Sequence, residues 1–174
     1  MRSLKSILGL TALACALQAA AVSIEVRDEG DRPLAGAVVF LESAQARRQV
    51  RPLTQAEMGQ AGKQFVPQVL VVPVGTAVDF PNRDTVRHHV YSFSPAKKFE
   101  LKLYIGTPAN PVVFDRSGIA VLGCNIHDQM VGWVFVVETP YYAMSDAQGR
   151  AVIDAPPGSY RLRSWHPGLP VGAA

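Results

Sequence analysis

Apolar and polar residues alternate with a period of two in many short stretches, which is typical of half-buried β-strands. Residues 22–27 (VSIEVR) show this alternation, and residues 37–41 and 69–72 are short apolar runs bounded by turn residues. The chain of 174 residues contains 14 glycines and 13 prolines, which separate these stretches. No long amphipathic pattern lies between them. The pattern predicts an all-β protein with an antiparallel sandwich or barrel.

The same pattern predicts further strands in the rest of the chain, at residues 77–80, 89–93, 99–104, 119–122 and 131–137. A final hairpin is predicted from residues 150–154 and 160–165, joined by a Pro-Pro-Gly corner. Residues 43–64 are polar and only weakly periodic. They are interpreted as a long connection with room for one helical turn.

The N-terminus has the pattern of an export signal. Arg2 and Lys5 form a short basic region, residues 7–14 are apolar, and three alanines end at Ala21. The apolar run is shorter than the roughly 20 residues that a membrane-spanning helix needs. We expect a signal peptide at residues 1–21 and a periplasmic protein with no membrane span. A buried N-terminal helix is the less favoured alternative, because strand alternation follows directly.

Charge and cysteine content narrow the function classes. The chain has 17 Lys+Arg and 14 Asp+Glu, and loss of Arg2 and Lys5 with the signal leaves 15 basic residues. This balance, without a basic run interleaved with aromatic residues, argues against nucleic-acid binding. Cys15 lies in the signal, after residues that fit a lipoprotein signal poorly, so Cys124 is the one thiol of the expected mature chain. It is then a core residue, a nucleophile, an intermolecular link or a metal ligand.

The spacing C-x2-H-x2-M places Cys124, His127 and Met130 in a short loop between two predicted strands. His88, at the start of another strand, offers a second imidazole. One thiolate, two imidazoles and a weak thioether are the donors of an electron-transfer copper site. Structural zinc prefers several cysteines, and a Cys–His nucleophile lacks a visible third group to orient the imidazole.

Residues 123–130, together with residues 65–67 and 71–82, resemble the cupredoxin (blue copper) family. The resemblance is to its amicyanin- and plastocyanin-like members, and chains of this kind are also labelled methylamine utilisation proteins. It covers residues 64–138 and implies a Greek-key β-sandwich. It also implies one mononuclear copper ion that alternates between Cu(I) and Cu(II).

The resemblance assigns His88, Cys124 and His127 as equatorial copper ligands and Met130 as the axial ligand. Neighbours in a strand face opposite ways, so only one of His88 and His89 can face the metal. The resemblance places the ligand eight positions into the segment that begins at Pro81, which selects His88. The family often has Asn at the next position, where this chain has His89. Asp128 and Gln129, which follow His127, replace the apolar patch usual in the family. They imply a more polar docking face.

The flanks have a second resemblance. Residues 24–39 and 145–162 resemble carboxypeptidase regulatory-like or transthyretin-like sandwich modules. The expected organisation has N-terminal module strands at 22–44, a linker at 45–63, the copper domain at 64–138 and a C-terminal hairpin at 139–174. Either the copper segment is inserted into one module, or all strands form one enlarged sandwich.

The function expected from these features is a periplasmic type 1 copper protein that carries single electrons. It is not expected to be an enzyme, because the protein fills all four ligand positions. The expected partner is a redox protein such as a c-type cytochrome or a periplasmic dehydrogenase, with His127 as the electron exit, and the protein is expected to be a monomer. The alternatives are a copper chaperone or storage protein and a β-sandwich binding module.

Overall fold

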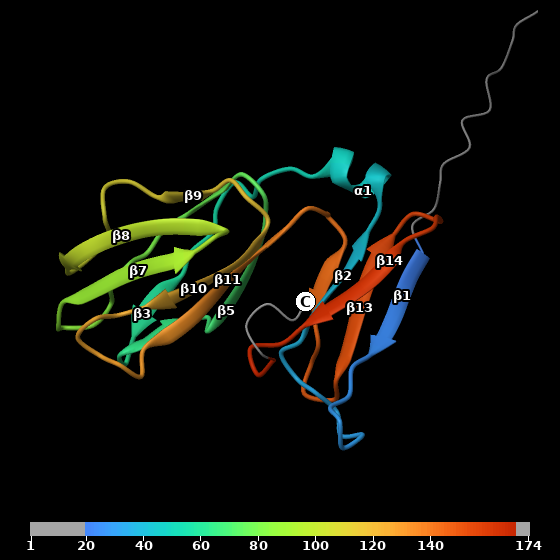
Figure 1. Ribbon diagram of the computed structural model, residues 1–174, viewed down its shortest axis with the longest axis horizontal. Coiled ribbons are helices and arrows are strands. Elements are labelled where there is room, and N and C mark those ends of the chain that lie inside the picture. The colour runs from blue at the N-terminus through green and yellow to red at the C-terminus, as the bar shows by residue number, and fades with distance from the viewer. Residues whose placement is uncertain (1–19, 170–174) are drawn as a thin grey trace, which may run out of the picture.

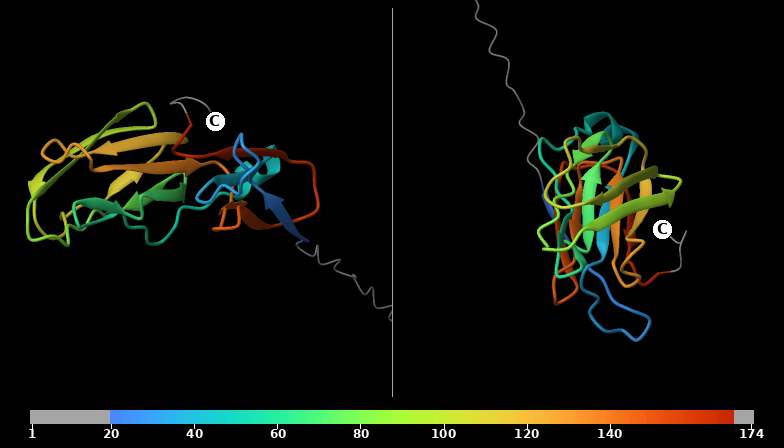
Figure 2. Two further views of the ribbon diagram at one scale, coloured as in Figure 1. Left: turned by 90° about the horizontal axis from the view of Figure 1, so that it is seen from below. Right: turned by 90° about the vertical axis from the view of Figure 1, so that its left-hand side faces the viewer.

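The computed structural model describes residues 20–169 as two β-lobes that lie side by side (Figures 1 and 2). We call β3 to β11 the central lobe, and β1, β2 and β12 to β14 the flanking lobe. Most of the predicted signal peptide, residues 1–21, lies outside the described residues. The one α-helix among residues 20–169 has six residues, too few to cross a membrane.

The central lobe contains a five-stranded sheet. Its strands are, in spatial order, β5 (Val69–Pro73), β11 (Val131–Val137), β10 (Gly118–Gly123), β7 (His88–Ser94) and β8 (Lys97–Tyr104). The pairs are antiparallel except β11 with β5, which are parallel. The predicted positions of these strands are confirmed, but the sheet is mixed rather than purely antiparallel.

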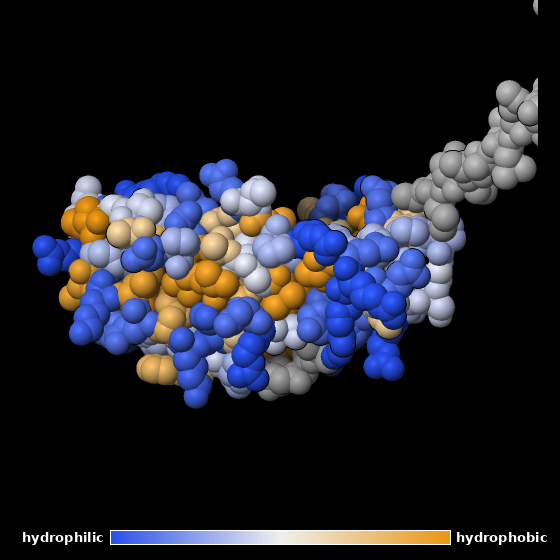
Figure 3. All heavy atoms as spheres, turned by 90° about the horizontal axis from the view of Figure 1, so that it is seen from above, coloured by the Kyte–Doolittle hydropathy of each residue, from blue (hydrophilic) through white to orange (hydrophobic). Residues whose placement is uncertain are grey.

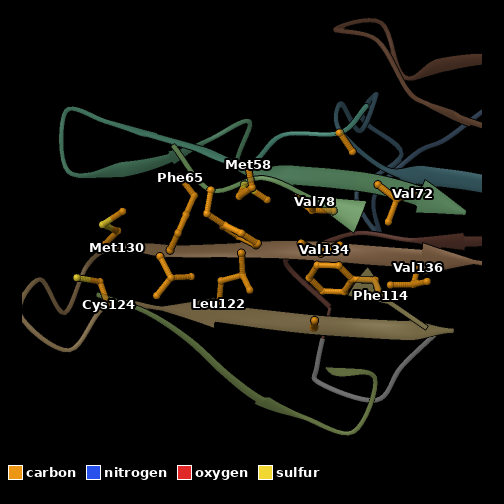
Figure 4. Close-up of a cluster of buried hydrophobic side chains, with 14 residues drawn as sticks. Met58, Phe65, Val72, Val78, Phe114, Leu122, Cys124, Met130, Val134 and Val136 are labelled. Carbon is orange, nitrogen blue, oxygen red and sulfur yellow. The ribbon is translucent and has the colours of Figure 1, made fainter. Parts of the chain in front are cut away.

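Two short ribbons cover the inner face of this sheet. One pairs β3 (Gly59–Ala61) with β4 (Gln64–Val66), and the other pairs β6 (Thr76–Val78) with β9 (Val112–Phe114). Buried apolar side chains, which include Met58, Phe65, Phe114 and Leu122, fill the space between the layers (Figure 4). The prediction of an all-β sandwich is therefore confirmed.

The segment expected as a linker contains regular structure. Helix α1 (Ala44–Gln49) begins where the Ser43 hydroxyl accepts the backbone N–H of Ala46 at 3.0 Å. Strand β3 follows, and Met58 beside it is fully buried. Short strands of Gly, Gln and Ala carry no alternation, so the sequence pattern could not reveal β3.

The flanking lobe is built from both ends of the chain. One sheet orders β12 (Tyr142–Met144), β2 (Val38–Glu42) and β14 (Arg161–Trp165), and the other pairs β1 (Ala20–Glu25) with β13 (Arg150–Ala155). Apolar side chains between the two sheets form its core, which contains Val39, Leu41, Ala151, Ile153 and Ala155. The central lobe thus stands between the two halves of the flanking lobe along the chain.

The predicted C-terminal hairpin is wrong in its pairing. Strand β13 pairs with β1, where Ala151 lies opposite Ile24, and β14 pairs with β2 in the other sheet. The corner between them crosses from one sheet to the other. The reason is the burial of β2, whose side chains are covered on both faces. Strand β14 pairs with β2 and extends that sheet, so it is not available to pair with β13.

A third apolar cluster joins the lobes, and we call it the seam. Val38, Phe40 and Trp165 of the flanking lobe pack against Phe135 and Val137 of the central lobe. The rings of Phe135 and Trp165 stack with centroids 5.4 Å apart and planes 11° apart. In Figure 3, apolar residues spread over the central lobe as far as the junction, whereas the flanking lobe presents a mostly hydrophilic face.

Candidate metal centre

Three predicted ligands come together at one end of the central lobe. Nδ1 of His88 lies 3.2 Å from Nδ1 of His127, and Sγ of Cys124 lies 3.7 Å from the same His127 nitrogen. The three ligand atoms lie within 4.8 Å of one another. His88 and Cys124 are buried, while His127 is half-buried and reaches the surface.

The loop between β10 and β11 carries two of these side chains. The backbone N–H of Met130 donates to the carbonyl of His127 at 2.8 Å, which closes a tight turn. Since β10 and β11 are paired on either side, from Gly123 opposite Val131 onward, the loop has little freedom. The seven residues between the two strands, 124–130, thus direct Cys124 and His127 toward one point.

Gly123 allows the neighbouring strand to approach the site closely. A Cβ atom at this position would lie 2.7 Å from the ring of Tyr91, which is closer than side-chain atoms pack. Gly123 is also the point where β10 pairs with β7, the strand that begins with His88. The missing side chain therefore lets the Cys124 loop and the His88 strand meet.

Asp84 orients His88. Nε2 of His88 lies 2.7 Å from Oδ2 of Asp84, and an ionised carboxylate only accepts, so the imidazole proton is on Nε2. The lone pair of Nδ1 then faces Cys124 and His127. The backbone N–H of Lys63 also donates to Asp84, as does that of Gly62. The Lys63 bond first, then the His88 imidazole and the Gly62 bond, hold the pKa of the Asp84 carboxyl below its usual value.

Asp84 is not among the residues that the sequence pattern singles out. The one feature of the sequence that points to Asp84 is its position four residues before His88. That spacing alone does not show that the two side chains are in contact. The turn between them is fixed by Asn82, whose side-chain amide donates to the carbonyls of Val86 and Tyr104 at 2.9 and 2.8 Å. Burial of Tyr104 raises the pKa of its hydroxyl to about 12, and that hydroxyl donates to a backbone carbonyl.

His89 does not belong to the group. Its Nε2 lies 2.7 Å from a carboxylate oxygen of Glu100 in β8, and its ring lies beside Tyr91, with centroids 5.6 Å apart. Its Nδ1 is buried and has no hydrogen-bond partner among the described residues. Because His88 and His89 are neighbours in β7, their imidazoles point to opposite faces of the strand. Only His88 lies beside Cys124 and His127, as predicted.

Met130 ends the same loop and is 1% exposed. It belongs to the same buried cluster as Cys124, and Figure 4 shows both sulfur atoms at the same end of that cluster. Its role as the axial ligand stays a prediction.

The residues present fit a single copper ion. Metal–nitrogen and metal–sulfur bonds are about 2.0 and 2.3 Å long, so separations of 3.2 and 3.7 Å allow one ion to contact all three atoms. A thiolate, two imidazoles and a thioether suit copper, whereas structural zinc sites use more thiolates and no thioether.

Three of the solved structures to which this chain is similar are described as a cupredoxin, a copper-containing nitrite reductase and an amicyanin. A purple cupredoxin from Nitrosopumilus maritimus is 26% identical and covers 48% of this chain and 100% of its own, with a TM-score of 0.43. A copper-containing nitrite reductase from Thermus scotoductus SA-01 is 27% identical, over 51% of this chain and 23% of its own, with a TM-score of 0.45. A reduced amicyanin variant is 20% identical and covers 57% of this chain and 98% of its own, with a TM-score of 0.41.

No family model matches the chain, and no curated protein sequence matches it. The solved structures belong to the family that the sequence resembles, or contain copper, and the methylamine-utilisation label has no counterpart among them. Their TM-scores are below 0.5, so the assignment of the site depends on the side chains described above.

Proposed function

We propose that this protein is a mononuclear copper protein that carries single electrons between redox partners. One observation carries the proposal: the ligand atoms of His88, Cys124 and His127 lie within 4.8 Å of one another at the end of a rigid β-sandwich. Copper, when bound, supplies one-electron chemistry between Cu(I) and Cu(II). The chain holds the donors, buries the thiolate and keeps water from most of the site.

His127 is the route by which the electron leaves. It is half-buried, while His88 and Cys124 are buried, so its ring edge is the part of the site nearest to solvent. Ile126 beside it is 49% exposed, and Asp128 and Gln129 follow on the surface. A redox protein such as a c-type cytochrome or a dehydrogenase would dock on this mixed apolar and acidic edge.

The N-terminal sequence supports export, and we propose that the protein works in the periplasm. An enzymatic role is not proposed, because the predicted ligands leave no position open for a substrate. A copper chaperone would need ligands that exchange readily, whereas Cys124 is 4% and His88 0% exposed. Burial of this kind favours a resident ion.

The variant Cys124→Ser tests the proposal. The copper-loaded protein should show an intense visible band from thiolate to Cu(II) and reversible electrochemistry, and the variant should lose the band. The matched control, Met144→Leu, alters an exposed methionine and should keep both. A band that survives Cys124→Ser, or a wild-type protein that binds Cu(I) but shows no band with Cu(II), would contradict the electron-carrier function.

A further inference from the structure

A cavity of about 430 Å³ opens beside the seam, far along β10 from the metal-site loop. The turn between β7 and β8, the start of β10, and the segment after β14 surround it. Its walls are mainly apolar and come from both lobes: Ile119, Val121, Trp133, Trp165, Pro167 and Leu169. Small-molecule sites commonly have this size and this position between two structural units.

Both tryptophans of the chain lie in these walls. Trp133 belongs to the central lobe and Trp165 to the flanking lobe, and their ring centroids are 6.4 Å apart at an angle of 58°. Trp165 is 3% exposed, while Trp133 is half-buried. The two indoles therefore form an aromatic corner that a flat ring can contact on its face and on its edge.

One charge faces this cavity. Arg116 is the one charged residue among those that line it. No hydrogen bond or ion pair of its guanidinium is found within residues 20–169, although it attracts the carboxylate of the neighbouring Asp115 at longer range. Asp115 itself forms its ion pair with Lys97, at 3.1 Å. Ser94 is already engaged, since its hydroxyl accepts the backbone N–H of Val121 at 2.9 Å. The hydrogen-bond donors of the guanidinium are therefore available to an anionic group.

We propose that this cavity binds a small aromatic carboxylate. The ring would lie against Trp133 and Trp165, and the carboxylate would accept hydrogen bonds from Arg116. The lining residues include one cation and no acid, so the cavity should prefer an anionic ligand to a cationic one. Its apolar walls should prefer a ligand with a ring to one with a polar chain. The site uses none of the predicted copper ligands, so a test of this proposal does not depend on whether the protein binds copper.

The test uses the metal-free protein and 2-naphthoate as the probe. Because the chain has two tryptophans, the two indole N–H signals in an ¹H–¹⁵N spectrum report directly on the cavity. Both signals should shift and saturate as 2-naphthoate is added. The neutral analogue 2-naphthalenemethanol should bind about tenfold more weakly, as expected when a charge-assisted hydrogen bond is lost. Unmoved indole signals, or equal affinity for the neutral alcohol, would overturn the proposal.

Two variants separate the charge from the cavity. Arg116→Ala should weaken 2-naphthoate binding about tenfold and leave the neutral alcohol unaffected. Arg48→Ala, an exposed cation on α1, is the matched control and should change neither. Val121→Phe should fill the cavity and reduce binding of both probes, with the unfolding midpoint measured to confirm the fold. Wild-type affinity in Arg116→Ala or in Val121→Phe would refute this site.

Discussion

The metal-site end of the central lobe and the seam at its outer face are built from opposite kinds of side chain. The seam is apolar: the ring of Phe135 contacts the rings of Phe40 and Trp165. The metal-site end buries polar groups, such as His88 and Asn82, and holds them with specific hydrogen bonds. The first arrangement stabilises the molecule, and the second fixes the position of donor atoms.

The difference has a physical basis. Burial of apolar surface lowers the free energy of the folded state without specifying directions. A buried imidazole is unfavourable unless its nitrogen atoms are bonded, but those bonds set its orientation. Changes at the seam should therefore alter the free energy of unfolding and leave the metal site intact. Changes at Asp84 should alter the metal site and leave the free energy of unfolding nearly unchanged.

The largest expected effect comes from the seam. Trp165→Ala removes a ring that is 3% exposed and should lower the free energy of unfolding by about 3–5 kcal/mol, measured by denaturant unfolding. The thiolate-to-copper band should not change, because Trp165 contacts neither the ligand loop nor His88. Phe93→Ala, which removes a ring that is 76% exposed, should change stability by less than about 0.5 kcal/mol. A shifted band in Trp165→Ala would show that the two regions are coupled.

The intermediate effect concerns Asp84. Asp84→Asn replaces the carboxylate that holds the Nε2–H of His88, and metal affinity should fall about 10- to 100-fold, as measured by competition with a chelator. The reduction potential should rise, because a less basic imidazole stabilises Cu(II) less. Asp154→Asn alters an exposed carboxylate on β13 and should leave both quantities unchanged. Unaltered affinity and potential in Asp84→Asn would mean that this contact does not tune the ligand.

The smallest expected effect is at Met130. Met130→Leu keeps the volume of a buried side chain, so the free energy of unfolding should change by less than about 1.5 kcal/mol. The visible band should persist, since the thiolate and both imidazoles remain. The reduction potential should rise, because the thioether no longer donates to Cu(II). An unchanged potential would remove Met130 from the ligand set.

The local sequence pattern was enough to predict the strands with clear alternation and the two ligands in the loop between β10 and β11, Cys124 and His127. The C-x2-H-x2-M spacing is local, and it marks a turn that the paired strands β10 and β11 enforce. Alternation along a strand allows only one of His88 and His89 to face the metal, and the resemblance to the cupredoxin family selected His88. The loop ligands needed only short-range geometry, whereas His88, which is distant in the sequence, needed the family resemblance.

Long-range pairing was beyond the sequence pattern. Nothing in the residues of β13 shows that its partner is β1, more than a hundred positions away, instead of β14. The contact between Asp84 and His88 depends on a turn whose shape is set by Asn82 and by the amides of Gly62 and Lys63. Such contacts depend on tertiary structure.

The two-sided burial of β2 has a practical consequence for anyone who wishes to shorten the protein. Val38 and Phe40 cover Val69, Phe135 and Val137 of the central lobe. An excised copper-binding fragment would expose that sheet face to water and would tend to aggregate. A minimal electron-transfer protein derived from this scaffold would therefore require polar replacements on the outer face of β5 and β11 before it could remain in solution.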